Sequence, residues 1–122
     1  MPYDLRVVRT ANWLEAATNP ITREEIDRLI QSDPELDWSS SDYVEMKQEG
    51  GISRFYMIAW NGRSCFLWHE DQITCATPDE RQVAKLIDIA QKLKANVVGD
   101  DGEQYSSSRS LFGKRKIKIV QP

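Results

Sequence analysis

The sequence predicts an α+β fold in which an antiparallel sheet carries two helices packed on one face. Two segments with helical periodicity each follow a capping motif, and four strand-like runs separated by turn residues lie between them. One further strand-like run precedes the first helix and another follows the second, so the predicted order is β-α-β-β-β-β-α-β. Strands joined by tight turns pair antiparallel, so the central runs form a meander whose apolar face both helices cover.

The first strand is predicted at residues 3–10 and the first helix directly after Thr22. Residues 3–10 read YDLRVVRT, which is rich in β-branched and aromatic side chains and free of glycine and proline. Thr22 is the expected N-cap, because Glu25 three residues later completes a capping box. Apolar side chains then recur at helical spacing at Ile26, Leu29 and Ile30. The helix should stop before Asp33, since the residue ahead of Pro34 avoids the α region.

The central strands are predicted from four runs of β-forming residues. They span residues 42–48, 54–60, 63–69 and 72–76. Asn61-Gly62, between the second run and the third, is a favoured two-residue hairpin turn because both residues tolerate positive φ. The other two turns are expected at Gly50-Gly51 and Glu70-Asp71. Each neighbouring pair of runs is therefore expected to form a hairpin.

The second helix has a strong start signal at residues 77–80. Thr77 is the expected N-cap, Pro78 the first helical residue and Glu80 the capping-box partner. The apolar face of this helix follows at helical spacing: Val83, Leu86, Ile87, Ala90 and Leu93. The helix is expected to end near Ala95-Asn96, and the last strand begins there.

The segment that follows, GDDGE at residues 99–103, concentrates carboxylates and glycines. Calcium loops place their oxygens at alternating positions, and phosphate loops carry a Lys and a Ser or Thr after the glycines, so neither pattern matches. Asp101-Gly102 is instead a strong hairpin signal, which predicts a turn that folds residues 103–105 back against Val97-Val98. The alternative is a surface Mg²⁺ site or partner contact formed by Asp100, Asp101 and Glu103.

The charge distribution divides the chain into an acidic body and a basic tail. Residues 1–105 hold all 19 acidic residues and 11 of the 16 basic ones, a net charge of −8, whereas residues 106–122 carry +5. We expect one α+β domain at residues 1–105, followed by a polar linker and basic C-terminal tail at 106–122. The acidic body disfavours nucleic-acid binding. The tail is interpreted as a disordered terminus or an edge strand, with membrane contact through its lysines as the alternative.

The chain shows no signal for secretion, catalysis or a cofactor. Its start carries charges among the apolar residues, and two cysteines are too few for a disulfide scaffold, so a cytoplasmic location is expected. Cys65, His69 and Cys75 are candidate zinc ligands by residue type, but their spacing fits no common zinc pattern and a fourth ligand is missing. No nucleophile elbow or Walker loop occurs, so no catalytic residue, metal site or cofactor is predicted.

One tryptophan is a candidate for partner recognition. Trp38 lies between predicted elements, and of the four tryptophans it is the one that we expect to be exposed. An exposed tryptophan among carboxylates would serve as a hot spot for a basic protein. The predicted partner-binding residues are Trp38, Asp33, Glu35, Asp37 and Asp42.

Several motifs together resemble a family of short, uncharacterised bacterial proteins. They are the YDL…R…W start, PITREE…DPEL at residues 20–36, TPDE at 77–80 and GDDGEQY at 99–105. The chain differs from this pattern at Ile26, where tryptophan is common, at Thr77, where asparagine is common, and at residues 94–96, where a Leu-Gly-Ala turn is common. The resemblance implies no enzymatic mechanism. Small acidic bacterial proteins of this kind are similar to the immunity proteins of toxin systems.

The predicted function is that of a non-enzymatic protein-binding module, most concretely an immunity-type protein that neutralises a bacterial toxin through an acidic surface. Charge complementarity to a basic toxin would speed their association. Two alternatives stay open. One is a small metal-dependent enzyme or regulator that uses Asp100, Asp101 and Glu103 together with His69. The other is an adaptor that binds a membrane or nucleic acid through the basic tail.

Overall fold

The computed structural model describes residues 3–48, 51–109 and 115–121 of the chain, with side chains outside 40–54 and 108–116. The elements follow one another as β1 (Asp4–Val8), the 3₁₀-helix η1 (Trp13–Thr18), α1 (Arg23–Ser32), β2 (Leu36–Gln48), β3 (Gly51–Trp60), β4 (Arg63–His69), β5 (Gln72–Ala76), α2 (Glu80–Leu93), β6 (Asn96–Gly99), β7 (Gln104–Arg109) and β8 (Arg115–Val120).

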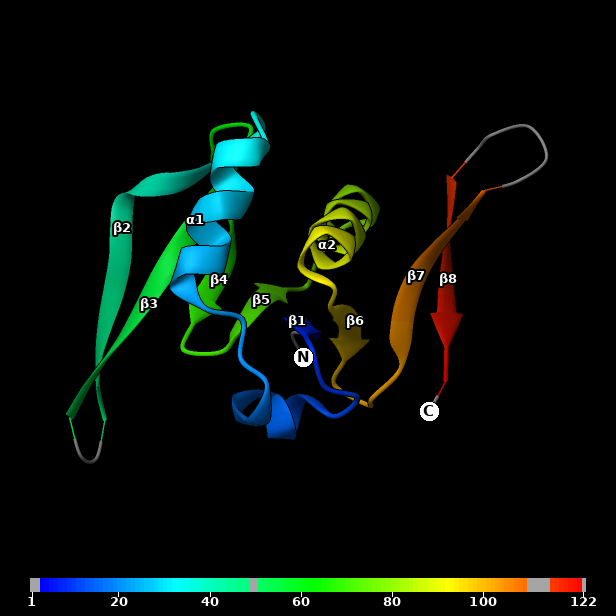
Figure 1. The fold of residues 1–122 in the computed structure, drawn as a ribbon, viewed down its shortest axis with the longest axis horizontal. Helices are drawn as coiled ribbons and strands as arrows, with labels where there is room; N and C mark the ends of the chain where they lie inside the picture. The colour runs from blue at the N-terminus through cyan, green and yellow to red at the C-terminus, as the bar shows by residue number, and fades with distance from the viewer. Residues whose placement is uncertain (1–2, 49–50, 110–114, 122) are drawn as a thin grey trace.

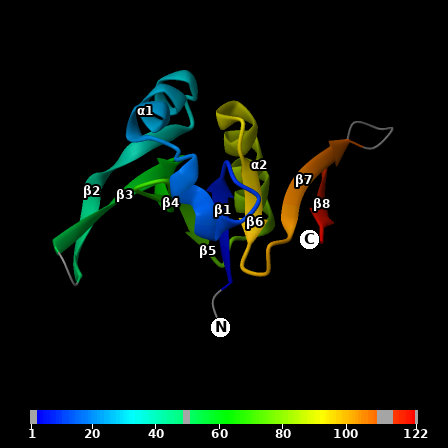
Figure 2. The ribbon, with the colours of Figure 1, turned by 60° about the horizontal axis from the view of Figure 1, so that its bottom comes forward.

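The strands form one antiparallel sheet, with α1 and α2 on the same side of it (Figures 1 and 2). The strand order is β2-β3-β4-β5-β1-β6-β7-β8, so the first strand of the chain lies in the middle. α1 packs over β2, and α2 packs over β1, β6 and β7. The predicted α+β class, the meander of β2 to β5 and the placement of both helices on one face are confirmed.

The main core lies between the two helices and the sheet. Its fully buried side chains come from both layers: Leu5, Val7, Ile26, Ile58, Phe66, Ile73, Leu86, Ile89 and Val97. Burial of each such side chain stabilises the fold by about 1.5–3 kcal/mol. η1 lies against the opposite face, where Ala16 and Trp13 pack on Val8 and Val98. Because side chains alternate along a strand, β1 supplies apolar residues to both faces.

The start of α1 is confirmed and the start of α2 is corrected. Thr22 caps α1, and its side chain and that of Glu25 bond reciprocally to the backbone as a capping box. The prediction of Thr77 as the cap of α2 was wrong, because Asp79 caps that helix and Gln82 completes its box. The Thr77 N–H donates to the carbonyl oxygen of Tyr3 at 2.7 Å, which holds Thr77 at the end of the sheet. α2 ends at Leu93, slightly earlier than expected.

The strands differ from the prediction mainly in length and in the tail. The strands at 63–69 and 72–76 agree with β4 and β5, while β2 starts at Leu36 and β3 at Gly51, earlier than expected. The Gly50-Gly51 turn lies partly outside the described residues. A polar linker was predicted from residue 106 onwards, but β7 continues the sheet there and pairs with β8. Ser107, for example, lies opposite Ile117. Serines form a strand here because the alternating KIKIV segment supplies a paired neighbour, as in the edge-strand interpretation of the tail.

Candidate functional site

The GDDGE segment forms the hairpin turn between β6 and β7. The Gly99 N–H donates to the Glu103 carbonyl oxygen at 2.9 Å, and the Gly102 N–H donates to the Gly99 carbonyl oxygen at 3.1 Å. Gly102 has a φ of 83°, a conformation that glycine adopts without a steric cost. Val97 pairs with Tyr105. Residues 103–105 therefore fold back against β6, as the sequence predicts.

The three carboxylates of the β6–β7 hairpin lie in different surroundings. Asp100 accepts a hydrogen bond from Arg6 Nη1 at 2.5 Å, and this bond holds the pKa of Asp100 below its usual value. Glu103 is buried and accepts from the Tyr3 hydroxyl, while Asp101 is exposed. Burial, followed by this hydrogen bond, raises the pKa of Tyr3. Within the described part of the chain, no cluster of three His, Cys, Asp or Glu residues is placed to hold a metal ion.

Gly99 accommodates the buried Glu103 carboxylate. A Cβ atom at residue 99 would overlap that carboxylate and the Tyr3 hydroxyl. The lack of a side chain at Gly99 therefore lets Glu103 reach Tyr3 beneath the turn. This pair joins the start of the chain to the β6–β7 hairpin, which is a structural role for Glu103.

Of the three residues considered for zinc, His69 lies apart from the two cysteines, since Cys65 packs against the same core cluster that contains Cys75. Cys75 is buried in the core on the helix-covered face, and burial raises the pKa of its thiol to about 11. His69 follows the core residue Trp68, so alternation places His69 on the other face. Its ring stacks on Phe55 with 3.9 Å between ring centroids. Cys75 and His69 therefore cannot share a metal within this fold.

The predicted partner-binding residues divide into buried and exposed members. Trp38 is partly buried, and its Nε1 donates to Asp27 Oδ1 at 2.6 Å, so the expectation of an exposed ring was wrong. Asp33 is only 5% exposed and accepts from Lys85 Nζ at 2.8 Å and Lys92 Nζ at 3.2 Å. Its charge is therefore answered within the molecule. The side chain of Asp42 lies outside the described residues.

Glu35 and Asp37 line a surface hollow of about 550 Å³ beside the start of β2. Trp38, Asn61 and Ser64 contribute to its wall, and the described lining residues include these two carboxylates and no Lys or Arg. We call this feature the acidic hollow. Both carboxylates are exposed, although Glu35 Oε1 also accepts from Lys85 Nζ at 2.7 Å. This hydrogen bond is the main reason that the pKa of Glu35 lies below its usual value.

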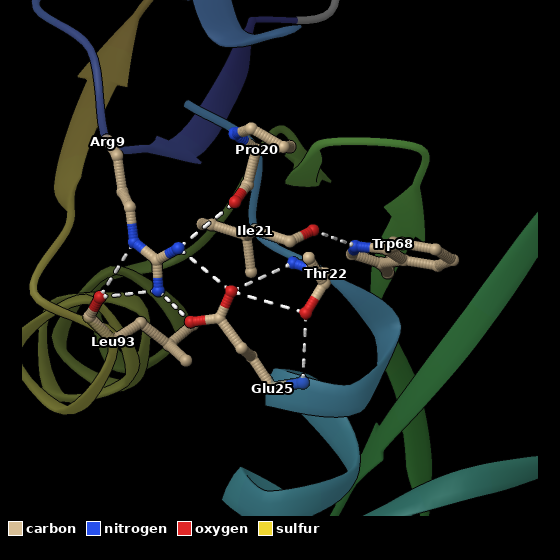
Figure 3. A network of polar contacts seen from close by, with 7 residues as sticks. All are labelled: Arg9, Pro20, Ile21, Thr22, Glu25, Trp68 and Leu93. Atoms are coloured by element: carbon tan, nitrogen blue, oxygen red, sulfur yellow. Dashed lines mark hydrogen bonds and ion pairs between the residues drawn. The ribbon is translucent and has the colours of Figure 1, made fainter. Parts of the chain in front are cut away.

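Arg9 joins α1 and α2 through a network of hydrogen bonds (Figure 3). Its Nε and Nη2 atoms donate to the Leu93 carbonyl oxygen at 3.1 and 3.0 Å, and Nη1 donates to the Pro20 carbonyl oxygen at 3.0 Å. The same guanidinium binds both carboxylate oxygens of Glu25. The hydrogen bond from Arg9 outweighs burial and lowers the pKa of Glu25 to about 2.

Arg9 and Leu93 are 84 residues apart, so no local pattern could have identified this network. Only the position of Arg9 at the end of the first predicted strand was visible in the sequence.

No protein-family model, curated protein or solved structure matches this chain. In the part of the chain that the structure describes, neither helix combines the length and apolarity needed to cross a membrane. The resemblance to short bacterial proteins therefore stays a prediction, and function is inferred from the geometry of the chain.

Proposed function

We propose that this protein is a non-enzymatic binding module that captures a basic protein, most concretely as an immunity-type protein that neutralises a bacterial toxin. The observation that supports this proposal is the acidic hollow. It presents two exposed carboxylates in a concave surface whose described lining holds no Lys or Arg: Asp37, and Glu35, one oxygen of which is already paired with Lys85. A Lys or Arg side chain of a partner would find charge-assisted hydrogen bonds there.

The wall of the hollow is held in place before a partner arrives. Trp38 is fixed by its bond to Asp27 and by an edge-on contact with Tyr56, with 6.0 Å between ring centroids. A side chain that is already ordered loses little conformational entropy on binding, which favours affinity. In this proposal Trp38 is a rigid wall of the site, and the two neighbouring carboxylates are its contacts with the partner.

The net charge of −8 on residues 1–105 supports the same proposal at longer range. An acidic protein attracts a basic partner through solution, and this attraction raises the association rate. Metal-dependent chemistry at the β6–β7 hairpin would instead need converging carboxylates, whereas Asp100 and Glu103 are bound to Arg6 and Tyr3.

The test uses the basic product of a gene adjacent to that of this protein as the partner, with binding followed on a biosensor. Asp37→Asn should weaken binding by about 1–2 kcal/mol, since it removes one carboxylate from the hollow. Glu24→Gln is the matched control, because Glu24 is an exposed carboxylate in the first turn of α1 outside the hollow. The wild-type association rate should fall as the Debye length shrinks from about 10 Å at 0.1 M salt to about 3 Å at 1 M.

Two results would count against this function. One is that no basic neighbouring product binds the protein. The other is that Asp37→Asn and Glu24→Gln weaken binding equally, which would show that net charge acts without the hollow.

A further inference from the structure

A second concave surface lies between α1 and α2, and its charge is opposite to that of the acidic hollow. It encloses about 600 Å³. Arg28 and Ser32 line it from α1, and Lys92 lines it from α2. Lys94, the C-cap residue of α2, completes the lining. We call it the basic cleft. Leu29 and Leu93, both buried in the core, give it apolar surface as well.

The cations of the basic cleft differ in how far they are already neutralised. Arg9 and Glu25 also line the cleft, but they bind each other and cancel in charge. The Lys92 side chain is 48% exposed, and among the described residues it pairs with Asp33 alone. Arg28 and Lys94 are exposed, and within the described residues neither side chain takes part in a hydrogen bond, an ion pair or a cation–π contact.

Helix electrostatics accounts for only part of this arrangement. Cations in the last turn of a helix are favoured by its dipole, which explains Lys92 and Lys94. Arg28 lies in the middle of α1, where that explanation does not apply. Lys94 also has a φ of 54°, the left-handed conformation for which glycine is preferred at the end of a helix. A lysine at this position is therefore less stable in its backbone conformation than a glycine would be, but it places a positive charge in the cleft.

We propose that the basic cleft binds a small organic phosphate, a phosphate monoester that carries an apolar group. Arg28 can bind two phosphate oxygens with its planar fork, and the two lysines supply point charges. The accessible edges of Leu29 and Leu93 contact the apolar part of the ligand. The volume of about 600 Å³ lies in the range typical of small-molecule sites, which indicates a small ligand. Bound phosphate also removes the mutual repulsion of the three cations.

The experiment is isothermal titration calorimetry of the full chain with phenyl phosphate at constant ionic strength. Two control compounds are titrated separately. Inorganic phosphate represents the anionic half of phenyl phosphate, and phenol represents its apolar half. We expect saturable one-site binding of phenyl phosphate, weaker binding of inorganic phosphate and no binding of phenol. Arg28→Gln should weaken phenyl phosphate binding at least about tenfold, which corresponds to about 1.4 kcal/mol.

Two further variants separate a binding site from a general effect of charge. Arg81→Gln is the matched control, because Arg81 is exposed on α2 and lies outside the lining of the basic cleft. It should bind phenyl phosphate like the wild type. Lys94→Gly should bind more weakly and yet melt at a higher temperature, because glycine adopts the left-handed conformation without cost.

The proposal is overturned if phenyl phosphate shows no saturable binding, or if Arg81→Gln weakens binding as much as Arg28→Gln. It is also overturned if Lys94→Gly melts higher but binds phenyl phosphate like the wild type, since Lys94 would then have no role in the cleft. All three substituted residues, Arg28, Arg81 and Lys94, are exposed, so each variant is expected to fold, and circular dichroism verifies this.

Discussion

At the scale of single residues, Asp79 determines where α2 begins. Its side chain accepts from the Gln82 N–H at 2.8 Å, and the Gln82 side chain accepts from the Asp79 N–H at 2.9 Å. Thr77, two residues earlier, has a φ of 45°, which is uncommon for a β-branched residue. Thr77 and Asp79 are both residue types that cap helices. The contact of Thr77 with the sheet decides between them.

We predict that Asp79→Ala lowers the free energy of unfolding by about 1 kcal/mol, because an unpaired N–H is left at the start of α2. Thr77→Ala, the control at the position that the sequence favoured, should change it by less than about 0.5 kcal/mol. Urea denaturation measures both. A larger effect at Thr77 than at Asp79 would contradict the assignment of the cap.

At the scale of elements, the β6–β7 hairpin depends on the backbone of Gly102 more than on the charge of Asp101. Gly102 has a positive φ, whereas the Asp101 side chain is exposed to solvent. The hairpin also carries Glu103 into its buried contact with Tyr3, so a distorted turn would expose that pair to water.

Gly102→Val should therefore destabilise the protein by about 2 kcal/mol or more, since a β-branched side chain resists positive φ. Asp101→Asn should leave the melting temperature nearly unchanged, because asparagine is tolerated in the same turn. Differential scanning fluorimetry compares the two variants. Loss of a biological activity in a stable Asp101→Asn protein would instead assign this carboxylate a functional role.

Local signals in the sequence were sufficient for these elements and insufficient for the contacts between them. The capping box of Thr22 and Glu25 spans four residues, and the Asp101-Gly102 turn spans two, so both were visible in the sequence. The ion pair of Asp33 with Lys85 joins residues that are 52 apart. Asp33 was therefore predicted to be a surface charge that contacts a partner, although the fold buries it against Lys85.

The same limit applies to the candidate sites. Glu35 and Asp37 were predicted as contacts because they lie close together in the chain, and the fold places both in the acidic hollow. The basic cleft was not predicted, because Arg28 and Lys94 meet only when α1 packs beside α2.

At the scale of the whole molecule, two acidic groups link the α1 region to α2 and make stability depend on pH. Glu25 binds Arg9, which also holds the end of α2, and its pKa falls from 4.5 to about 2. Burial opposes ionisation of Asp33, but hydrogen bonds from Lys85, the Glu35 N–H and Lys92 lower its pKa from 3.8 to about 2. An acid with a lower pKa in the folded state stabilises the fold when ionised.

Stability should therefore be at its full value above about pH 4.5 and decline as the pH falls towards 2. Glu25→Gln should cost about 2–3 kcal/mol near pH 7, and its difference from the wild type should shrink over the same pH window. Thermal melts at a series of pH values measure this convergence. A difference that stays constant down to pH 2 would show that Glu25 acts through packing and not through its charge.

The central position of β1 has a consequence for how the chain folds. β1 pairs with β5 on one side and with β6 on the other, so it is the strand that joins β2–β5 to β6–β8. The meander needs only local pairings, whereas Leu5 meets Gly99 across almost the full chain. Closing a long loop costs entropy before its contacts form, which slows folding. During synthesis, β1 can complete its pairing only after β6 has been made.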